Sequence, residues 1–412
     1  MTVKVIDYFY LFFGTLILFL FSSSGWFATN LFNVKPALYT IFIGFIFLNA
    51  VNIFKYSSFL LTKNVKTLDF LIVTSIFIFF IIQGTINFYV SSFLALYFFI
   101  SSLYKYTINS KVNTLQIIIN CILISGIATT SGIYVGLIES VFFDTNFFHY
   151  YRPPGYPNPT SEIFKKLTGF NLSNHISGFQ VSYNYSAYII ISCLGVLNLA
   201  NYNKATIIFL KIFLFFALLL TQAKIGLLFI TVLLFLKILV NFKKNFKFVI
   251  ISFICFGYLF LTHLTIVKSG TEILYTNYYR EFAFNLFNFD FYLSLFSWLK
   301  LTSFDYWMSS DVSFVGLNDF LVLSNHTEPH SLFFSCIFIG GWAFAILLSI
   351  KLGLILFNYF FKNDNREIYF SAALCSFIVE SIIWDSYDAP IFWLIVLLGS
   401  NYSGQPKYDT FI

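Results

Sequence analysis

The sequence predicts an all-α, polytopic membrane protein with about twelve transmembrane helices, each long enough to cross a bilayer. Hydrophobic residues make up 58% of the 412 residues and charged residues only 10%. The apolar residues come in runs of about twenty, which is the length of a membrane-spanning helix. So few charges could not coat soluble domains or solvate a disordered chain. Five cysteines are too few to stabilise a disulfide-rich protein of this length.

Twelve apolar stretches are expected to form the spans of a single integral membrane domain, residues 1–412. In chain order they cover residues 8–28, 36–54, 68–82, 86–104, 114–138, 183–200, 205–221, 223–240, 247–267, 332–357, 369–387 and 389–401. The first is predicted to be a retained signal anchor, because Lys4 precedes it and no small-x-small cleavage site follows Ser24.

The distribution of Lys and Arg predicts that both termini are cytoplasmic. Of the 24 such residues, fourteen fall on the side that carries the termini, eight on the other side and two inside spans. The fourteen lie almost wholly in short connections, whereas six of the eight lie in long loops, where the positive-inside rule has little weight.

Two long segments are then predicted to face outward, residues 143–182 and 268–331. Within the second, residues 282–299 are apolar enough to span the membrane, which would invert everything after them. We favour an interfacial helix, because apolar side chains form one stripe along it while polar ones interrupt the rest. The stripe consists of Phe284, Phe287, Phe291, Leu295 and Trp298.

Several motifs are absent, and their absence narrows the chemistry. The chain contains no G-x-x-x-x-G-K-[ST] phosphate loop, no G-x-G-x-x-G, no C-x-x-C and no D-x-D pair. Nucleotide hydrolysis and nucleotide-sugar chemistry are therefore not supported, and no cofactor is expected. The lysines are spread between apolar runs, which gives no indication of nucleic-acid binding. All five cysteines fall within predicted spans, where apolar packing is the expected role.

Three cations stand out in the predicted outward connections: Arg152, Arg280 and Lys224. Arginine forms a planar fork that binds phosphate through two parallel hydrogen bonds. Lys224 occupies a very short hairpin between two spans, where a cation has to stay near the outer boundary or meet an anion. For each residue, a snorkelling contact with lipid headgroups is the alternative to phosphate binding.

His326, Glu328 and His330 alternate just before the span at 332–357. An imidazole there is suited to act as a general base near neutral pH. No metal is expected, because Pro329 breaks any helix and no fourth ligand suggests itself. A satisfied interfacial histidine is the remaining alternative. The other histidines belong to no constellation: His149, His175 and His263.

Glu380 is predicted to lie inside the span at 369–387, where carboxylates are usually paired. Its expected partner is Lys224, an arginine or a sugar hydroxyl.

Three of these segments together resemble the bacterial O-antigen polymerase and ligase superfamily. They are Leu220-Thr221-Gln222-Ala223-Lys224 before a span, Arg280 opening an aromatic helix, and Pro329-His330-Ser331-Leu332 leading into Gly340-Gly341. In that family an outward motif ending in Arg begins a span, an Arg lies early in the large outward loop, and a His, commonly followed by Asn, closes that loop. Here Lys224 stands in place of the first Arg and Ser331 in place of the Asn. The order and loop placement of these features resemble the family over residues 152–399.

The resemblance implies a GT-C-like, metal-independent glycosyltransferase of the bacterial inner membrane, with its active site on the periplasmic side. Its donor would be an undecaprenyl-pyrophosphate-linked glycan, and its partners membrane lipid and a chain-length regulator protein. His330 would be the catalytic base, oriented by Glu328, while Arg280, Lys224 and Arg152 would bind pyrophosphate. Glu380 and His326 would pair with charges or contact the sugar.

Between the two activities of the superfamily, the sequence favours a polymerase of lipid-linked repeat units over a ligase that transfers the glycan to lipid A core. A flippase or transporter of the same lipid is the alternative of another class, although no internal repeat is visible. A structural scaffold is a third option.

Overall fold

The computed structural model describes residues 71–72, 74–75, 114–143, 147–150, 175–180, 182–200, 202–239, 246, 249–250, 252–254, 256–257, 332–360, 368–381 and 390–402, and this part of the chain is mostly helical. The elements in chain order are α5 (Thr114–Phe142), β1 (His149–Tyr150), β2 (His175–Ile176), α7 (Tyr183–Leu197), α8 (Lys204–Thr221), α9 (Lys224–Leu239), α15 (Leu332–Phe360), α16 (Ile368–Glu380) and α17 (Pro390–Tyr402).

Seven of the predicted spans coincide with these helices. The agreement is closest where capping residues bound an apolar run, as in α8. Asn203 Oδ1 accepts a hydrogen bond from the Thr206 backbone N–H at 2.7 Å, which satisfies one of the unpaired donors at the helix start. The other five predicted spans fall wholly or mostly outside the described residues, at 8–28, 36–54, 68–82, 86–104 and 247–267.

Two stretches of the described helices are long and apolar enough to cross a membrane: Ile119–Phe142 in α5 and Lys204–Thr221 in α8. Helix α8 exposes a row of large apolar side chains, among them Phe209 at 65% and Ile212 at 67% exposure. A contiguous exposed apolar face of this kind is unusual on a soluble protein and is typical of a surface that meets lipid or another protein.

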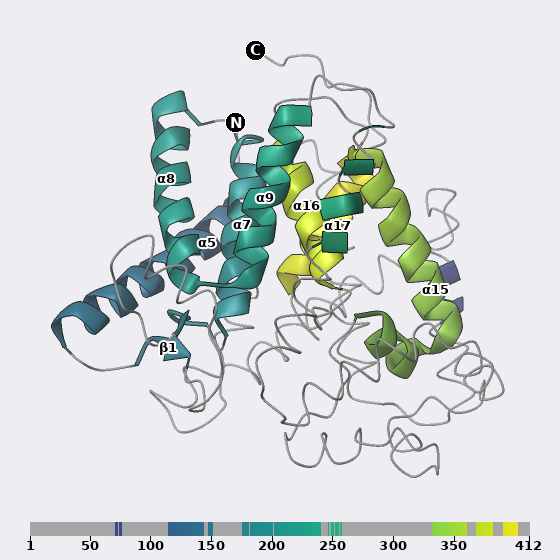
Figure 1. The fold of residues 1–412 in the computed structure, drawn as a ribbon, viewed down its shortest axis with the longest axis horizontal. Helices are drawn as coiled ribbons and strands as arrows, with labels where there is room; N and C mark the ends of the chain where they lie inside the picture. Colours follow the sequence, from purple (N-terminus) through teal and green to yellow (C-terminus); the bar gives the residue numbers. More distant parts are fainter. Residues whose placement is uncertain are drawn as a thin grey trace, which may run out of the picture.

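Helices α7 and α16 form the centre of the bundle. Nearly every residue of both is buried, as expected for helices that are apolar all round. Helices α5, α8 and α9 pack around α7, and α9 also packs along α16. Figure 1 shows α5 and α8 on one side, α15 on the other, and α16 and α17 between them.

Helices α5 and α7 run antiparallel. The Cys193 thiol donates to the Ile122 carbonyl at 2.9 Å, which brings the second half of α7 against the first half of α5. At the same end of the bundle the Tyr202 hydroxyl, just before α8, donates to Asn120 Oδ1 at 2.9 Å. We call this the α7/α8 end, and the end where α8 turns into α9 the turn end.

Helices α9 and α16 are also antiparallel. Near the finish of α9, Lys237 Nζ donates to the hydroxyl of Tyr369, which lies at the start of α16, at 3.4 Å. The start of α9 and the finish of α16 therefore lie together at the turn end. The start of α15 joins them there, because the Leu332 backbone N–H donates to the Ser381 carbonyl at 2.9 Å.

A short antiparallel pair, β1 with β2, packs against α5 close to the turn end. Strands of two residues show no periodicity, so the sequence prediction of a purely helical chain omitted them. The glycines of α5 allow the close approach: a Cβ at Gly136 would come 2.6 Å from Ile176 Cγ2, and one at Gly132 would come 2.9 Å from the Phe179 backbone N. The last part of the predicted loop 143–182 is thus buried against the helices.

Candidate functional site

The turn between α8 and α9 is buried, although a two-residue hairpin is expected at the surface. Thr221, Gln222 and Ala223 are 0%, 5% and 2% exposed. Gln222 adopts a left-handed conformation with φ 55°, and it is the only non-glycine residue to do so in the part of the chain that the structure describes. Gln222 is the C-cap of α8, and helices commonly end with a residue in this conformation.

Hydrogen bonds hold this turn in place. The Gln222 N–H donates to the Leu219 carbonyl at 3.1 Å, and the Thr221 hydroxyl donates to the Leu218 carbonyl at 2.7 Å. The Ala223 N–H in turn donates to the Thr221 hydroxyl at 3.3 Å. The backbone N–H groups of Gln222 and Ala223 and the Thr221 hydroxyl are therefore all paired within the turn.

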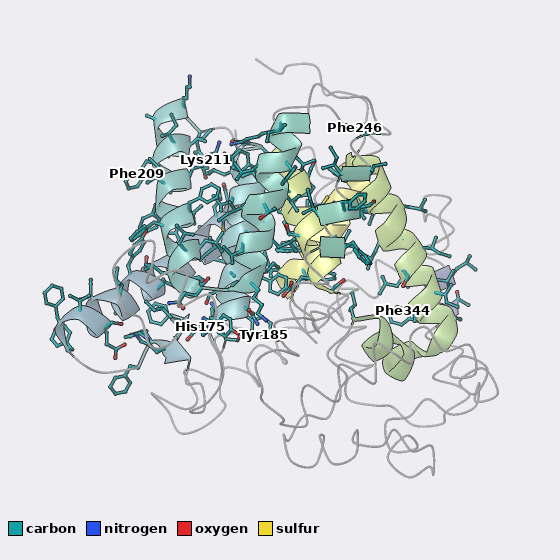
Figure 2. All side chains as sticks on the ribbon, viewed as in Figure 1. His175, Tyr185, Phe209, Lys211, Phe246 and Phe344 are labelled. Atoms are coloured by element: carbon teal, nitrogen blue, oxygen red, sulfur yellow. The ribbon has the colours of Figure 1, made fainter. Side chains whose placement is uncertain are left out.

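His175 clamps the turn from β2. Its Nδ1 lies 3.1 Å from the Thr221 carbonyl oxygen, and because a carbonyl can only accept, Nδ1 carries the hydrogen. The imidazole is 2% exposed and stacks on the Tyr183 ring at 4.0 Å between centroids. Figure 2 shows His175 near Tyr185, at the end of the bundle away from Lys211.

Lys224 is the first residue of α9 and is half-buried. The first turn of α9 contains no acidic residue. The start of a helix carries a partial positive charge, so a cation there raises the local positive potential and favours a bound anion.

Glu380 ends α16 and is 6% exposed, with Ser381 directly after it accepting the Leu332 N–H. Since α9 and α16 run antiparallel, Glu380 and Lys224 lie at the same end of the bundle. The start of α9 carries a partial positive charge and the end of α16 a partial negative charge. Lys224 would therefore be stabilised by the end of α16, and Glu380 by the start of α9.

A second polar group closes the end of α5. The Glu139 carboxylate accepts the backbone N–H groups of Phe147 and Phe148 at 2.6 and 3.0 Å. His149 Nε2 lies 2.7 Å from the Ser140 hydroxyl and 4.0 Å from Glu139 Oε2. These contacts fold residues 147–150 back over α5 and so position β1 to pair with β2.

Of the residues predicted to carry function, Lys224 and Glu380 are described, and both lie at the turn end. The others fall outside the described residues: Arg152, Arg280, His326, Glu328 and His330. Within the described part, no group of three His, Cys, Asp or Glu side chains is arranged to hold a metal ion.

Sequence reasoning missed the roles of His175 and Glu139. His175 contacts a residue 46 positions further along the chain, so no local spacing reveals the contact. A weak signal did exist: Gly132 and Gly136 form a G-x-x-x-G pair in α5, a spacing that announces close approach of another backbone.

Comparison with known proteins finds no relative: no family model, no curated protein and no solved structure matches this chain.

Proposed function

We propose that the chain is a membrane glycosyltransferase that polymerises lipid-linked oligosaccharide repeat units at the periplasmic face of the bacterial inner membrane. It would transfer the growing glycan from undecaprenyl pyrophosphate to a sugar hydroxyl of the next lipid-linked unit. The donor and the superfamily come from the sequence resemblance around Lys224, Arg280 and His330, and the side of the membrane also from the distribution of Lys and Arg.

The arrangement of the helices supports a multi-pass topology. Two described stretches have the length and composition of a span, and α8 presents an apolar face. The described helices alternate in direction as the predicted spans require, which leaves Lys204 and Lys237 at the α7/α8 end and the α8–α9 turn at the other. By the positive-inside rule the lysine-bearing end is cytoplasmic, and the turn end is periplasmic.

One observation carries the proposal: described residues from two of the segments that bear the resemblance, Lys224 and Leu332, lie at the turn end. Lys224 opens α9 there, and Leu332 is bonded to Ser381 at the finish of α16. His330 precedes Leu332 by two residues in the sequence and lies outside the described residues. The proposal expects the cation for pyrophosphate and the imidazole for proton transfer to act at this end of the bundle.

The proposed reaction needs little beyond this constellation. His330, oriented by Glu328, takes the proton from the acceptor hydroxyl, whose oxygen attacks the anomeric carbon of the donor. The bond from that carbon to the pyrophosphate oxygen breaks, and undecaprenyl pyrophosphate leaves. Lys224, Arg280 and Arg152 stabilise the negative charge that develops on the leaving group. Glu380 would balance Lys224 or bind a sugar hydroxyl.

The proposal is tested with the purified full-length protein, a lipid-linked repeat unit and gel analysis of the products. The wild type should yield a ladder of longer glycans without nucleotide or added metal. His330→Ala should insert normally and abolish extension, because removing a general base costs about 10²- to 10⁴-fold. Normal extension by this variant would remove His330 as the base.

A gene deletion separates the polymerase from the ligase. A single repeat left on the lipid A core indicates a polymerase. Loss of all repeats from the core, with accumulated lipid-linked polymer, indicates a ligase. If the protein in liposomes moves the lipid-linked unit across the bilayer without extending it, the protein is a flippase and not a glycosyltransferase.

A further inference from the structure

Two lysines converge on one tyrosine ring at the α7/α8 end of the bundle. Lys211 Nζ of α8 lies 4.3 Å from the centroid of the Tyr369 ring, and Lys237 Nζ of α9 lies 5.2 Å from the same centroid. Lys237 Nζ also donates to the Tyr369 hydroxyl at 3.4 Å. The two ammonium groups are therefore within about 10 Å of each other, the screening length at 0.1 M salt, and their charges repel.

The tyrosine ring is held in place by its neighbours, so the two cations are positioned rather than merely exposed. The Phe215 ring packs on Tyr369 at 6.4 Å between centroids, and Phe215 also stacks on Phe229 at 6.1 Å. Tyr369 thus sits between α8 and α9 at the start of α16. Its π face attracts both ammonium groups, but it carries no full negative charge that could neutralise them.

Among the residues that the structure describes, no carboxylate is paired with Lys211 or Lys237 to supply that missing charge. Lys211 lies seven residues into a span-length apolar helix, where a cation is expected to have an anionic partner or a water-filled surrounding. Further along the sequence, Lys243, Lys244 and Lys247 follow α9 within ten residues of Lys237. A local excess of lysine beside a span is the sequence pattern that binds anionic lipids.

We propose that Lys211 and Lys237, held on either helix beside Tyr369, bind the phosphate of an anionic glycerophospholipid of the cytoplasmic leaflet. The phosphate would accept hydrogen bonds from both ammonium groups, while the acyl chains lie along the exposed apolar face of α8, which includes Phe209 and Ile212. This site is at the end of the bundle opposite the turn end and is independent of the proposed transferase chemistry.

The test is lipid binding by the purified full-length protein in detergent, followed by native mass spectrometry. Dioleoyl phosphatidylglycerol should bind at least tenfold more tightly than dioleoyl phosphatidylcholine. Since each lysine near a lipid phosphate contributes about fivefold in affinity, K211Q and K237Q should each weaken phosphatidylglycerol binding by about that factor, and the double variant by about 30-fold. The double arginine variant, which keeps both charges, should bind like the wild type.

Lys204 provides the matched control, because it is exposed at the first residue of α8 on the same end of the bundle. K204Q should change the affinity less than twofold. If K204Q weakened phosphatidylglycerol binding as much as K211Q or K237Q, binding would depend on diffuse surface charge, and the proposed site would be wrong. A double glutamine variant that binds within twofold of the wild type would also overturn the site.

Two soluble probes distinguish the source of the phosphate. Glycerophosphoglycerol and inorganic phosphate should fail to displace the bound lipid at millimolar concentration, because they lack the acyl chains. Displacement by either at that concentration would indicate a soluble phosphate ligand and overturn the lipid assignment. Should the double glutamine variant fail to insert, the single variants and a Y369L variant, which removes the ring, give the same comparison.

Discussion

Replacing His175 by phenylalanine separates the two contacts that this side chain makes. Phenylalanine keeps an aromatic ring to stack on Tyr183, whereas the hydrogen bond from Nδ1 to the Thr221 carbonyl is lost. That carbonyl belongs to the last residue of α8, and helix-end carbonyls lack a partner within their own helix. Thr221 is fully buried, so water cannot replace the lost donor.

The expected loss in free energy of unfolding follows from this burial. A buried acceptor left without its donor costs about 1 to 3 kcal/mol. Unfolding entropy scales with chain length, and for a chain of this size such a loss lowers Tm by about 1 to 4 °C. Because the bond pins the turn that leads into Lys224, chain extension should fall more steeply than stability, by about 10²-fold, as expected when a substrate-positioning group shifts by about 1 Å.

The assay pairs thermal unfolding monitored by fluorescent size-exclusion chromatography with glycan extension on the same preparation. Phe209→Leu, on the exposed face of α8, is the control and should leave both readouts unchanged. An H175F protein with wild-type Tm and wild-type extension would refute the clamp. Equal fractional losses in folded protein and in activity would reduce His175 to a purely structural residue.

Three further outcomes are expected. Gly178→Ala should lower Tm by several degrees, because φ at this position is +60° and the new Cβ would lie 2.9 Å from backbone atoms. Gly353→Ala is the control: its Cβ would have no atom within 4 Å, so the change should be neutral or should stabilise the protein by up to about 1 kcal/mol. In the extension assay, Lys224→Arg should keep its activity, whereas Arg280→Lys should lose at least about tenfold in activity, because only the second exchange removes the bidentate contact with phosphate. An inactive Lys224→Arg variant would indicate a pairing that is specific for lysine. A cysteine at Asn325 should react with a membrane-impermeant maleimide in intact cells, and protection of that cysteine would contradict the periplasmic placement of its loop.

The helices were largely predictable from sequence because their signal is local. The predicted span 205–221 became α8 at Lys204–Thr221, and the span 223–240 became α9 at Lys224–Leu239. Each apolar run is long, and Asn203 and Gln222 cap the two ends of α8. The predicted span 369–387 is described as helix only to Glu380, since residues 382–389 lie outside the described part.

The candidate site was predictable only in part, because its geometry depends on long-range packing. Lys224 and Glu380 stood out as charges in an apolar context, and the antiparallel packing of α9 and α16 brings them to one end. His175 gave no such signal: its role depends on a segment that folds back against α5 and reaches Thr221. The burial of Gln180, whose amide donates to Thr129 at 3.1 Å, likewise depends on that tertiary contact.

The fit between Gly126 and Cys193 constrains how this protein can vary. A methyl group at position 126 would overlap the Cys193 sulfur, while the thiol itself is bonded to the neighbouring carbonyl of Ile122. The two positions therefore share one fixed volume across the α5–α7 interface. Divergent versions of the chain should exchange bulk between them in a correlated way, with alanine at 126 accompanied by glycine or alanine at 193.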